Sequence, residues 1–187
     1  MNIQPQEITT KTGKNIVIRL PNGNDSVAEL AVFINALSHE DTYITFSGEV
    51  ITLEEETVYM DSVYALMEKK HMVKLTAWDG DRLVGTCDIS RMIDKRKRGA
   101  HIGRFGLTIA KDYRGEGLGL KLAQATIEAA KQEIPGLKII ILDVYEPNET
   151  AINLYKKLGF TEYGRLENGV LYKGQYFAEL QMKLDIE

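Results

Sequence analysis

The segment Arg114-Gly115-Glu116-Gly117-Leu118-Gly119 constrains the fold more than any other part of the sequence. It follows an alternating apolar pattern at residues 100–110, which is typical of a strand, and it leads into a helical pattern. Glycines permit a tight turn and a close approach of the backbone to a ligand. The N–H groups of a first helical turn, aided by the helix dipole, favour an anion. The sequence therefore predicts a phosphate-binding turn in an α/β protein.

Two other phosphate-binding loops have spellings that this segment lacks. A Walker A loop and a dinucleotide-binding loop, counted from Gly115, would each need a glycine at position 120, where Leu120 stands. The dinucleotide-binding loop also follows the first strand of its fold, whereas this segment follows four predicted strands. The spelling that fits is Arg/Gln-x-x-Gly-x-Gly, with Arg114, Gly117 and Gly119.

Apolar periodicity and capping signals predict the element order β-α-α-β-β-β-α-β-α-β-β, an α/β or α+β fold with a mixed sheet. We expect Asp25 to cap the first helix and Asn148 to cap the last, while Thr52 and Glu55 form a capping box. Strands are expected at residues 15–20, 71–78, 82–92, 100–110, 139–142, 160–172 and 176–186. Helices are expected at about 26–37, 52–67, 118–134 and 148–158.

The composition is that of an ordinary globular protein, with 44% hydrophobic and 27% charged residues. We expect one domain over residues 1–187, with residues 1–14 as a loose N-terminal extension, because no Pro/Gly/Ser linker divides the chain. The N-terminus has no apolar signal segment, and the longest apolar runs are too short to span a bilayer. The only cysteine, Cys87, is expected in the core and cannot form an internal disulfide. These features predict a cytoplasmic protein.

The net charge and the spacing of the histidines argue against nucleic acid, a membrane or a metal ion as a partner. A net charge of −4 gives no overall attraction to nucleic acid or to an anionic membrane, so neither is expected as a partner. The basic run at residues 95–98 has no interleaved aromatic residues and is interpreted as a solvated turn. His39, His71 and His101 are scattered along the chain, so no metal site is expected.

Two motifs together resemble the GCN5-related N-acetyltransferase (GNAT) family. Residues 107–119 resemble its fourth strand and pyrophosphate loop, and residues 148–160, from Asn148-Glu149-Thr150 to Leu158-Gly159-Phe160, resemble its other signature helix and turn. The motifs occur in the family's order, separated by a helix and a strand. The resemblance covers residues 72–186 well and the first 70 by element order only. It implies the GNAT fold: a mixed, mostly antiparallel twisted sheet flanked by helices, with a splayed central pair of parallel strands.

The resemblance also implies an acyl-CoA-dependent N-acyltransferase. Its donor would be acetyl-CoA, and its acceptor a primary amine of a small molecule or of a protein N-terminus, which attacks directly in a ternary complex. A backbone N–H, that of Ile109 in particular, would polarise the thioester carbonyl. The residues expected to bind the coenzyme are Leu107, Thr108, Ile109, Arg114, Gly115, Glu116, Gly117, Leu118, Gly119, Leu120, Asn148 and Tyr155.

The same resemblance identifies candidates for acid and base catalysis. In the family, the tyrosine that matches Tyr155 supplies a proton to the departing CoA thiolate, and a phenol, with an ordinary pKa of about 10, suits that role. The general base stays open between Asp143, His101 and water. Asp143 occupies a position that holds a carboxylate in ribosomal-protein acetyltransferases, whereas His101 lies on the strand before the loop.

An alternative function is a non-catalytic acetyl-CoA-binding module that acts as a sensor or scaffold. Tyr155, Asn148 and the complete loop argue for the enzyme instead. The last predicted hairpin carries an apolar face that can pair with a second copy in a homodimer. That face consists of Tyr176, Ala178, Leu180, Met182, Leu184 and Ile186.

Overall fold

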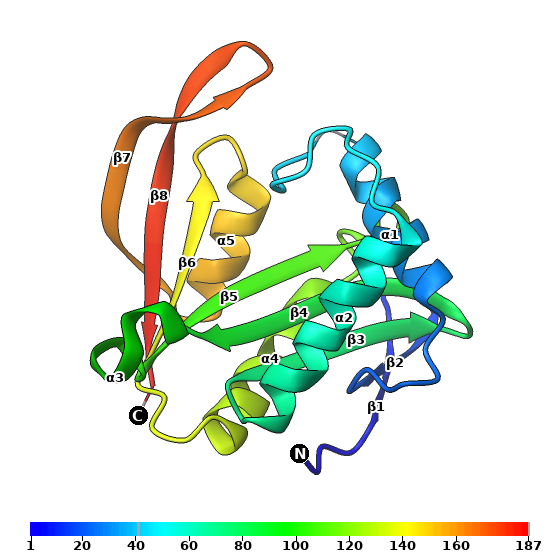
Figure 1. Ribbon diagram of the computed structural model, residues 1–187. Coiled ribbons are helices and arrows are strands. Elements are labelled where there is room, and N and C mark those ends of the chain that lie inside the picture. The colour runs from blue at the N-terminus through cyan, green and yellow to red at the C-terminus, as the bar shows by residue number, and fades with distance from the viewer. Residues whose placement is uncertain (41, 187) are drawn as a thin grey trace. The chain divides into compact units, whose positions relative to one another are not determined.

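The alternating apolar segments of the sequence form strands in the computed structural model, which describes residues 1–40 and 42–186 (Figure 1). The strands are β1 (Gln6–Thr9), β2 (Asn15–Arg19), β3 (Met72–Asp79), β4 (Arg82–Arg91), β5 (Ile102–Ile109), β6 (Ile139–Tyr145), β7 (Thr161–Tyr172) and β8 (Gln175–Asp185). The helices are α1 (Val27–His39), α2 (Leu53–Glu68), α3 (Arg96–Gly99), α4 (Leu118–Glu133) and α5 (Glu149–Lys157). Two short 3-10 helices are η1 (Ile93–Lys95) and η2 (Lys111–Tyr113).

The described residues group into two compact units. Unit 1 comprises those within residues 1–90 and 106–135, and unit 2 comprises those within 91–105 and 136–187. The boundary passes through β5, whose first half belongs to unit 2 and whose second half belongs to unit 1.

The described strands form an eight-stranded sheet in the order β1-β2-β3-β4-β5-β6-β8-β7. β5 and β6 run parallel, with Ile102 opposite Ile139 and Arg104 opposite Ile141. The pairs β1–β2, β2–β3, β3–β4, β6–β8 and β7–β8 run antiparallel. The mixed, mostly antiparallel sheet flanked by helices is thus confirmed. The splay expected further along β5, at residues 107–109, stays a prediction.

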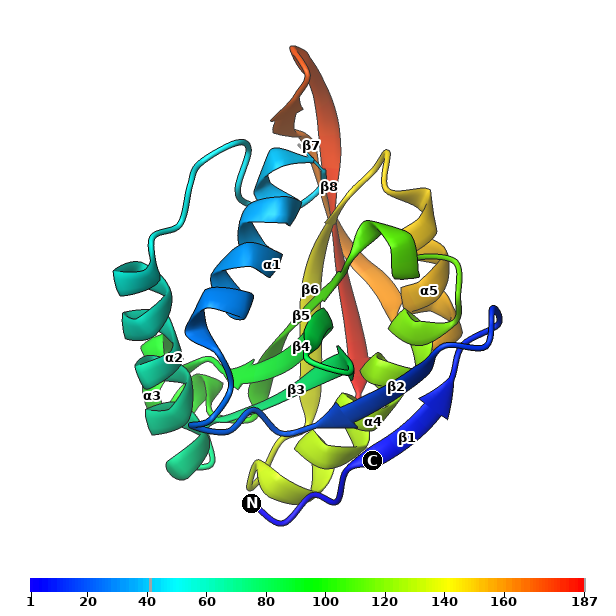
Figure 2. The same cartoon turned by 90° about the vertical axis from the view of Figure 1, so that its right-hand side faces the viewer.

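In unit 1, helices cover both faces of the strands: α1 and α2 lie on one face and α4 on the other (Figure 2). The first turn of α2 carries the predicted capping box, in which the Glu55 N–H donates to the Thr52 hydroxyl over 3.2 Å and Thr52 N–H donates to the Glu55 carboxylate over 2.8 Å. Because both faces are covered, every residue of β3 from Met72 to Trp78 is buried.

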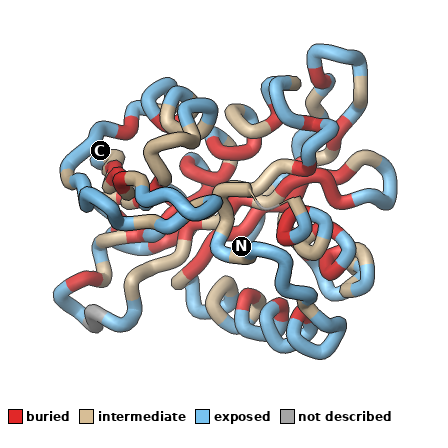
Figure 3. The backbone as a smooth tube through the Cα atoms, turned by 90° about the horizontal axis from the view of Figure 1, so that it is seen from above, coloured by how far each residue is buried: buried red, intermediate tan, exposed pale blue. Residues whose placement is uncertain are grey.

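The core follows from this double covering. Buried residues recur along the strands. Along the helices they alternate with exposed residues, because one side of each helix faces solvent (Figure 3). Cys87 on β4 is fully buried, which confirms its predicted place in the core, and burial raises the pKa of its thiol. In unit 2, the buried side of β8 includes Ala178, Leu180 and Met182, as the apolar alternation predicts. Tyr176 departs from that pattern and is 66% exposed, because it lies next to the turn of the hairpin.

Local details differ from the sequence-based expectations in three places. Residues 6–9, in the segment expected to be loose, form β1 because their backbone pairs with β2 from Gln6–Ile18 to Thr9–Asn15. Ser26 rather than Asp25 caps α1, since Asp25 is held by Arg19 at 2.6 Å. The expected turn at residues 94–98 forms η1 and α3, and the side chains of residues 95 and 96 lie outside the described part.

Candidate active site

The residues predicted to act fall into two groups, one in each unit. Unit 1 holds the strand residues 107–109 and the loop residues 114–120. Unit 2 holds the others, which are His101, Asp143, Asn148 and Tyr155.

The glycine loop, residues 114–119, has the left-handed backbone that its composition predicts. Gly115 has a φ of 74° and Gly117 a φ of 85°. A Cβ at either position would meet no heavy atom within 4 Å, so backbone conformation rather than space favours glycine here. Gly117 is the N-cap of α4, whose first N–H groups have no partner within the helix. Such a turn can receive an anion.

Arg114 braces this loop. Its Nε donates a hydrogen bond to the Ile109 carbonyl over 2.9 Å, and its guanidinium pairs with Glu40 at 2.8 Å. Glu40 is the C-cap residue of α1. The side chain therefore ties the end of β5 and the end of α1 to the loop. Its predicted contact with the coenzyme stays a prediction.

The strand residues that precede the loop are half-buried and packed against β4. The Thr108 and Thr86 hydroxyls are 2.9 Å apart, and Ala110 N–H donates to the Val84 carbonyl over 2.9 Å. A Cβ on Gly85 would lie 2.8 Å from Ile109 Cδ1, so the end of the Ile109 side chain packs directly over this glycine. Because the Ile109 side chain is packed against β4, any contact of this residue with a coenzyme would be made by its main-chain groups.

Sequence reasoning missed the contacts that the turn between β1 and β2 makes with the loop. Lys11 and Thr12 of this turn hydrogen-bond to Gly115 and Glu116. These residues lie 104 positions apart in the chain. The turn is polar and has no periodicity, so no local pattern indicates its partner.

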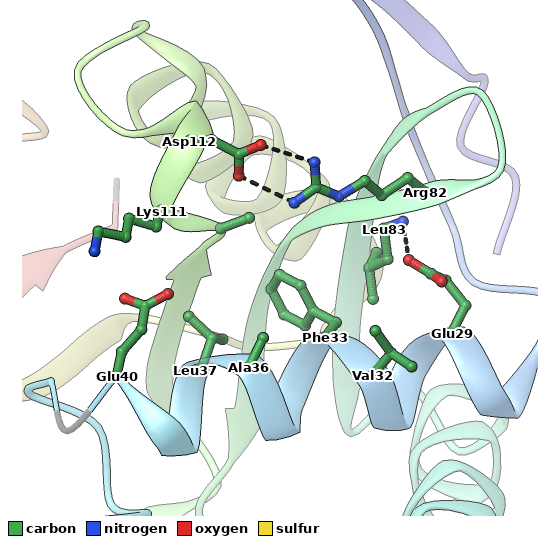
Figure 4. A pocket seen from close by; sticks show the side chains of 11 residues that line it. Glu29, Val32, Phe33, Ala36, Leu37, Glu40, Arg82, Leu83, Lys111 and Asp112 are labelled. Carbon is green, nitrogen blue, oxygen red and sulfur yellow. Dashed lines mark hydrogen bonds and ion pairs between the residues drawn. The ribbon is translucent and has the colours of Figure 1, made fainter.

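A small pocket in unit 1 lies beside residues 110–112, at the start of the loop (Figure 4). Its volume is about 140 Å³, which is less than the range of typical small-molecule sites. Arg82 closes one side through two hydrogen bonds to Asp112, of 2.7 and 3.0 Å, and these bonds hold the pKa of the Asp112 carboxyl below its ordinary value. The lining residues are Glu29, Val32, Phe33, Ala36, Leu37, Glu40, Arg82, Leu83, Ala110, Lys111 and Asp112.

In unit 2, helix α5 places Asn148 and Tyr155 on one face, two turns apart. The Asn148 side chain accepts a hydrogen bond from Ala151 N–H over 3.2 Å, which confirms the predicted cap. Tyr155 is 9% exposed, and its ring lies 5.7 Å from that of Phe105 and 6.0 Å from that of Phe160. This aromatic cluster restricts the orientation of the Tyr155 ring.

Asp143 lies on β6 among polar residues. Its carboxylate pairs with Arg104 at 2.9 Å. Tyr145, two residues later on the same face of β6, stands opposite Glu179 of β8, which places Glu179 near Asp143. Burial raises the pKa of Glu179, and the nearby Asp143 charge raises it further, while Arg104 lowers it. Two carboxylates and one guanidinium therefore meet on this face of the sheet, which favours a cationic ligand there.

His101 does not join this group. It is exposed and precedes β5, and its carbonyl accepts hydrogen bonds from the N–H groups of Lys138 and Ile139. Lys138 immediately precedes β6, and Asp143 comes five residues later in that strand, so the two candidate bases lie about 16 Å apart along the sheet. They cannot serve the same substrate nitrogen.

A second polar cluster that sequence reasoning missed is buried beneath α2 in unit 1. The Lys74 ammonium donates to the Tyr59 hydroxyl over 3.1 Å and lies 3.7 Å from the Asp88 carboxylate. Burial lowers the pKa of Lys74, but the Asp88 charge and the hydrogen bond to Tyr59 outweigh it and hold that pKa above its ordinary value. The signal available in the sequence is a lysine within an apolar strand pattern, at residues 72–78.

Two further observations concern the described residues alone. No helix within residues 1–40 and 42–186 is both long enough and apolar enough to cross a membrane. In the same part of the chain, no three His, Cys, Asp or Glu side chains gather in a way that can hold a metal ion.

A family model described as "Acetyltransferase (GNAT) family" matches residues 37–160. Among solved structures, an acetyltransferase of the GNAT family from Streptococcus pneumoniae is similar, with a TM-score of 0.81 and 30% identity. The similarity covers 92% of this chain and 99% of that one.

Curated relatives also match. An N-alpha-acetyltransferase 30 from Schizosaccharomyces pombe is 35% identical over 92 residues, which cover 48% of this chain and 58% of the relative. A spermidine N(1)-acetyltransferase from Escherichia coli is 25% identical over 130 residues, which cover 70% of this chain and 65% of the relative. The chain thus spans about three fifths of the length of these two relatives.

Proposed function

Because the chain belongs to the acetyltransferase (GNAT) family, we propose that it transfers an acetyl group from acetyl-CoA to a primary amine. The observation that carries this proposal is the left-handed glycine turn, at Gly115 and Gly117, that opens α4. It provides the N–H groups that a pyrophosphate needs, at the place where the family motif lies.

We propose that the amine attacks the thioester carbonyl directly, without an acyl-enzyme. Cys87 is the only cysteine of the chain, and it is fully buried with a raised thiol pKa. A thiol in that state is a poor nucleophile. This supports direct transfer over transfer through a cysteine.

The coenzyme contacts in this proposal belong mainly to the backbone. Loop residues 115–120 hold the pyrophosphate through N–H groups, and residues 107–109 hold the pantetheine arm, with the Ile109 N–H polarising the carbonyl. Asn148 adds a side-chain contact while it caps α5. The half-buried, packed side chains of residues 107–109 support these main-chain roles.

Tyr155 is the proposed acid. Its phenol gives its proton to the CoA thiolate as the carbon–sulfur bond breaks. The attacking nitrogen loses its second proton to water, which leaves a neutral amide, and the Tyr155 phenolate regains a proton from solvent. The ring packing against Phe105 and Phe160 supports this role, because it holds the phenol in one orientation.

Asp143 is the proposed base, acting directly or through water. An amine is mainly an ammonium ion at pH 7 and must lose a proton before it attacks. Asp143 and Glu179 outnumber the Arg104 charge beside them, which favours an ammonium at this face. His101 stands about 16 Å along the sheet and is the weaker candidate. The acceptor proposed is a small-molecule amine or a protein N-terminus.

Three further features complete the proposal. The family model takes residues from both units, which supports a single acetyltransferase domain. We also propose a cytoplasmic location, supported by the lone unpaired cysteine in a chain that cannot form an internal disulfide. The β8 face expected to pair with a second copy is not available for that role, because Ala178, Leu180 and Met182 are buried within the chain. A homodimer through the β7–β8 hairpin is proposed instead on its exposed apolar side chains, which lie at the end of the sheet.

The test is a thiol-release assay with acetyl-CoA and a panel of polyamines, amino acids and N-terminal peptides. We expect one amine class to release CoA, and Tyr155→Phe to lower kcat by about 10- to 100-fold while coenzyme binding measured by calorimetry is retained. Asp143→Asn should lower kcat, whereas His101→Gln should leave it unchanged. Binding of acetyl-CoA without turnover of any amine would favour a sensor module instead. Failure to bind acetyl-CoA would contradict the proposal.

A further inference from the structure

The turn between β1 and β2, residues 10–14, donates hydrogen bonds to acceptor groups of the glycine loop. We call it the N-terminal turn. The Lys11 ammonium donates to the Gly115 carbonyl over 3.1 Å, and the Lys11 N–H donates to the Glu116 carbonyl over 3.4 Å. The Thr12 N–H and hydroxyl each donate to the Glu116 carboxylate over 3.0 Å. All of these residues belong to unit 1.

These contacts determine which way the loop peptides face. In a planar trans peptide, the carbonyl of one residue and the N–H of the next point in opposite directions. Because the Gly115 and Glu116 carbonyls point to the N-terminal turn, the N–H groups of Glu116 and Gly117 point away from it. An anion needs this arrangement, with donors on its side of the loop and acceptors on the other.

Glu116 poses an electrostatic problem that the N-terminal turn solves. A carboxylate in the middle of a pyrophosphate loop would repel the ligand if it faced the phosphates. Partial burial raises the pKa of Glu116, but the hydrogen bonds from Thr12 and the nearby Lys14 charge outweigh this, so that the carboxyl has a pKa below its ordinary value. It is therefore ionised at neutral pH and held on the side of the turn.

We propose that the N-terminal turn is a positioning element of the coenzyme site, and this inference rests on the proposed function. Thr12 and Lys11 hold the loop carbonyls and the Glu116 carboxylate away from the bound pyrophosphate. The turn lies outside residues 37–160, the part that the family model matches.

The test compares acetyl-CoA affinity between the wild-type chain and full-length variants. In Thr12→Val and Lys11→Met the loop loses one charge-assisted hydrogen bond each, and we expect the double variant to bind acetyl-CoA about tenfold more weakly. KM for acetyl-CoA should rise by the same factor while kcat stays unchanged and the variant remains folded. Thr12→Ser keeps the hydroxyl and should bind like the wild type.

A matched control lies in the same hairpin. The Thr9 hydroxyl donates to Asn15 over 3.1 Å and does not touch the loop, so Thr9→Val should leave acetyl-CoA affinity unchanged. The charge argument has its own test in the Thr12→Val background. In Thr12→Val the Glu116 carboxylate has lost the hydroxyl that held it away from the coenzyme. Glu116→Gln removes the charge of that carboxylate and should recover part of the lost affinity.

The outcomes separate this inference from the proposed function. If the wild type binds acetyl-CoA and the Thr12 and Lys11 variants bind it equally well, the positioning role is wrong and the proposed function stands. If Glu116→Gln weakens the Thr12→Val variant further, the carboxylate does not repel the coenzyme and that half of the inference is wrong. A wild-type chain that binds no acyl-CoA would overturn both.

Discussion

Lys74 shows how a single charged residue depends on its surroundings. It is 4% exposed, and its ammonium lies between the Tyr59 hydroxyl and the Asp88 carboxylate under α2. Burial raises the pKa of Asp88, and the Lys74 charge only partly offsets that rise. Lys74 is therefore the group that favours the ionised form of this carboxyl against the effect of burial.

We predict that Lys74→Met destabilises the fold by about 3 kcal/mol, because it leaves a partly buried carboxylate without its cation. Urea denaturation at pH 7 measures the effect. Asp88→Asn in the same chain should restore part of the loss, since a neutral amide needs no counter-charge. Lys183→Met is the control, because the Lys183–Asp185 pair is exposed and worth little. Equal stabilities of the Lys74→Met and Lys183→Met variants would refute this account.

At the scale of elements, caps decide where helices begin. Thr52 and Glu55 satisfy each other's backbone N–H groups at the start of α2. Hydrogen bonds from the Thr52 N–H and hydroxyl lower the pKa of the Glu55 carboxyl. The cap therefore couples the stability of α2 to pH.

We predict that Thr52→Ala costs about 1 kcal/mol of unfolding free energy at pH 7.

The pH dependence of the stability has a defined sign. A carboxyl with a folded pKa below its unfolded value of about 4.3 stabilises the fold fully above that value and stops doing so as the pH falls through the folded pKa. Glu55→Gln should therefore lose less stability than the wild type between about pH 6 and 3. Urea titrations of both proteins at these pH values measure the effect. An equal or larger loss of stability in Glu55→Gln would contradict it.

At the scale of the whole molecule, the proposed homodimer depends on the β7–β8 hairpin. β7 is the last strand in the sheet order, and an uncovered edge strand readily pairs with another chain. The hairpin exposes four large hydrophobic side chains by 49% to 66%: Tyr163, Leu166, Leu171 and Tyr176. This combination is typical of an interface between copies.

We predict that light scattering gives twice the chain mass of 21.1 kDa for the wild type. Leu166→Lys with Leu171→Lys should yield the monomer, because charges on an edge strand oppose pairing. Val58→Lys is the control, since Val58 is equally exposed on α2 in unit 1. A monomeric wild type would rule out the dimer.

Features that depend on near neighbours in the chain could be predicted. The Thr52–Glu55 capping box and the Asn148 cap each join residues three positions apart, so the sequence contains the whole interaction. The left-handed turn at Gly115 and Gly117 is also local, because only the absence of a Cβ makes that backbone favourable. These short-range signals located the candidate site.

Features that depend on distant partners could not be predicted. β1 has no apolar alternation and exists because it pairs with β2, and Asp25 leaves the cap position because Arg19 holds it. The proposed preference for Asp143 over His101 as the base needed the strand register, which sets their separation along the sheet.

The sequence by itself determined the order of the longer elements from β2 onward, the loop and the signature helix, because steric preferences and hydrogen bonds within a few residues specify them. Only the tertiary structure decided which side of the loop presents its N–H groups. That orientation comes from Lys11 and Thr12, which lie 104 residues away from their partners in the chain. A contact between such distant residues leaves no periodicity in the sequence, because it is made only when both strands and the loop have folded together.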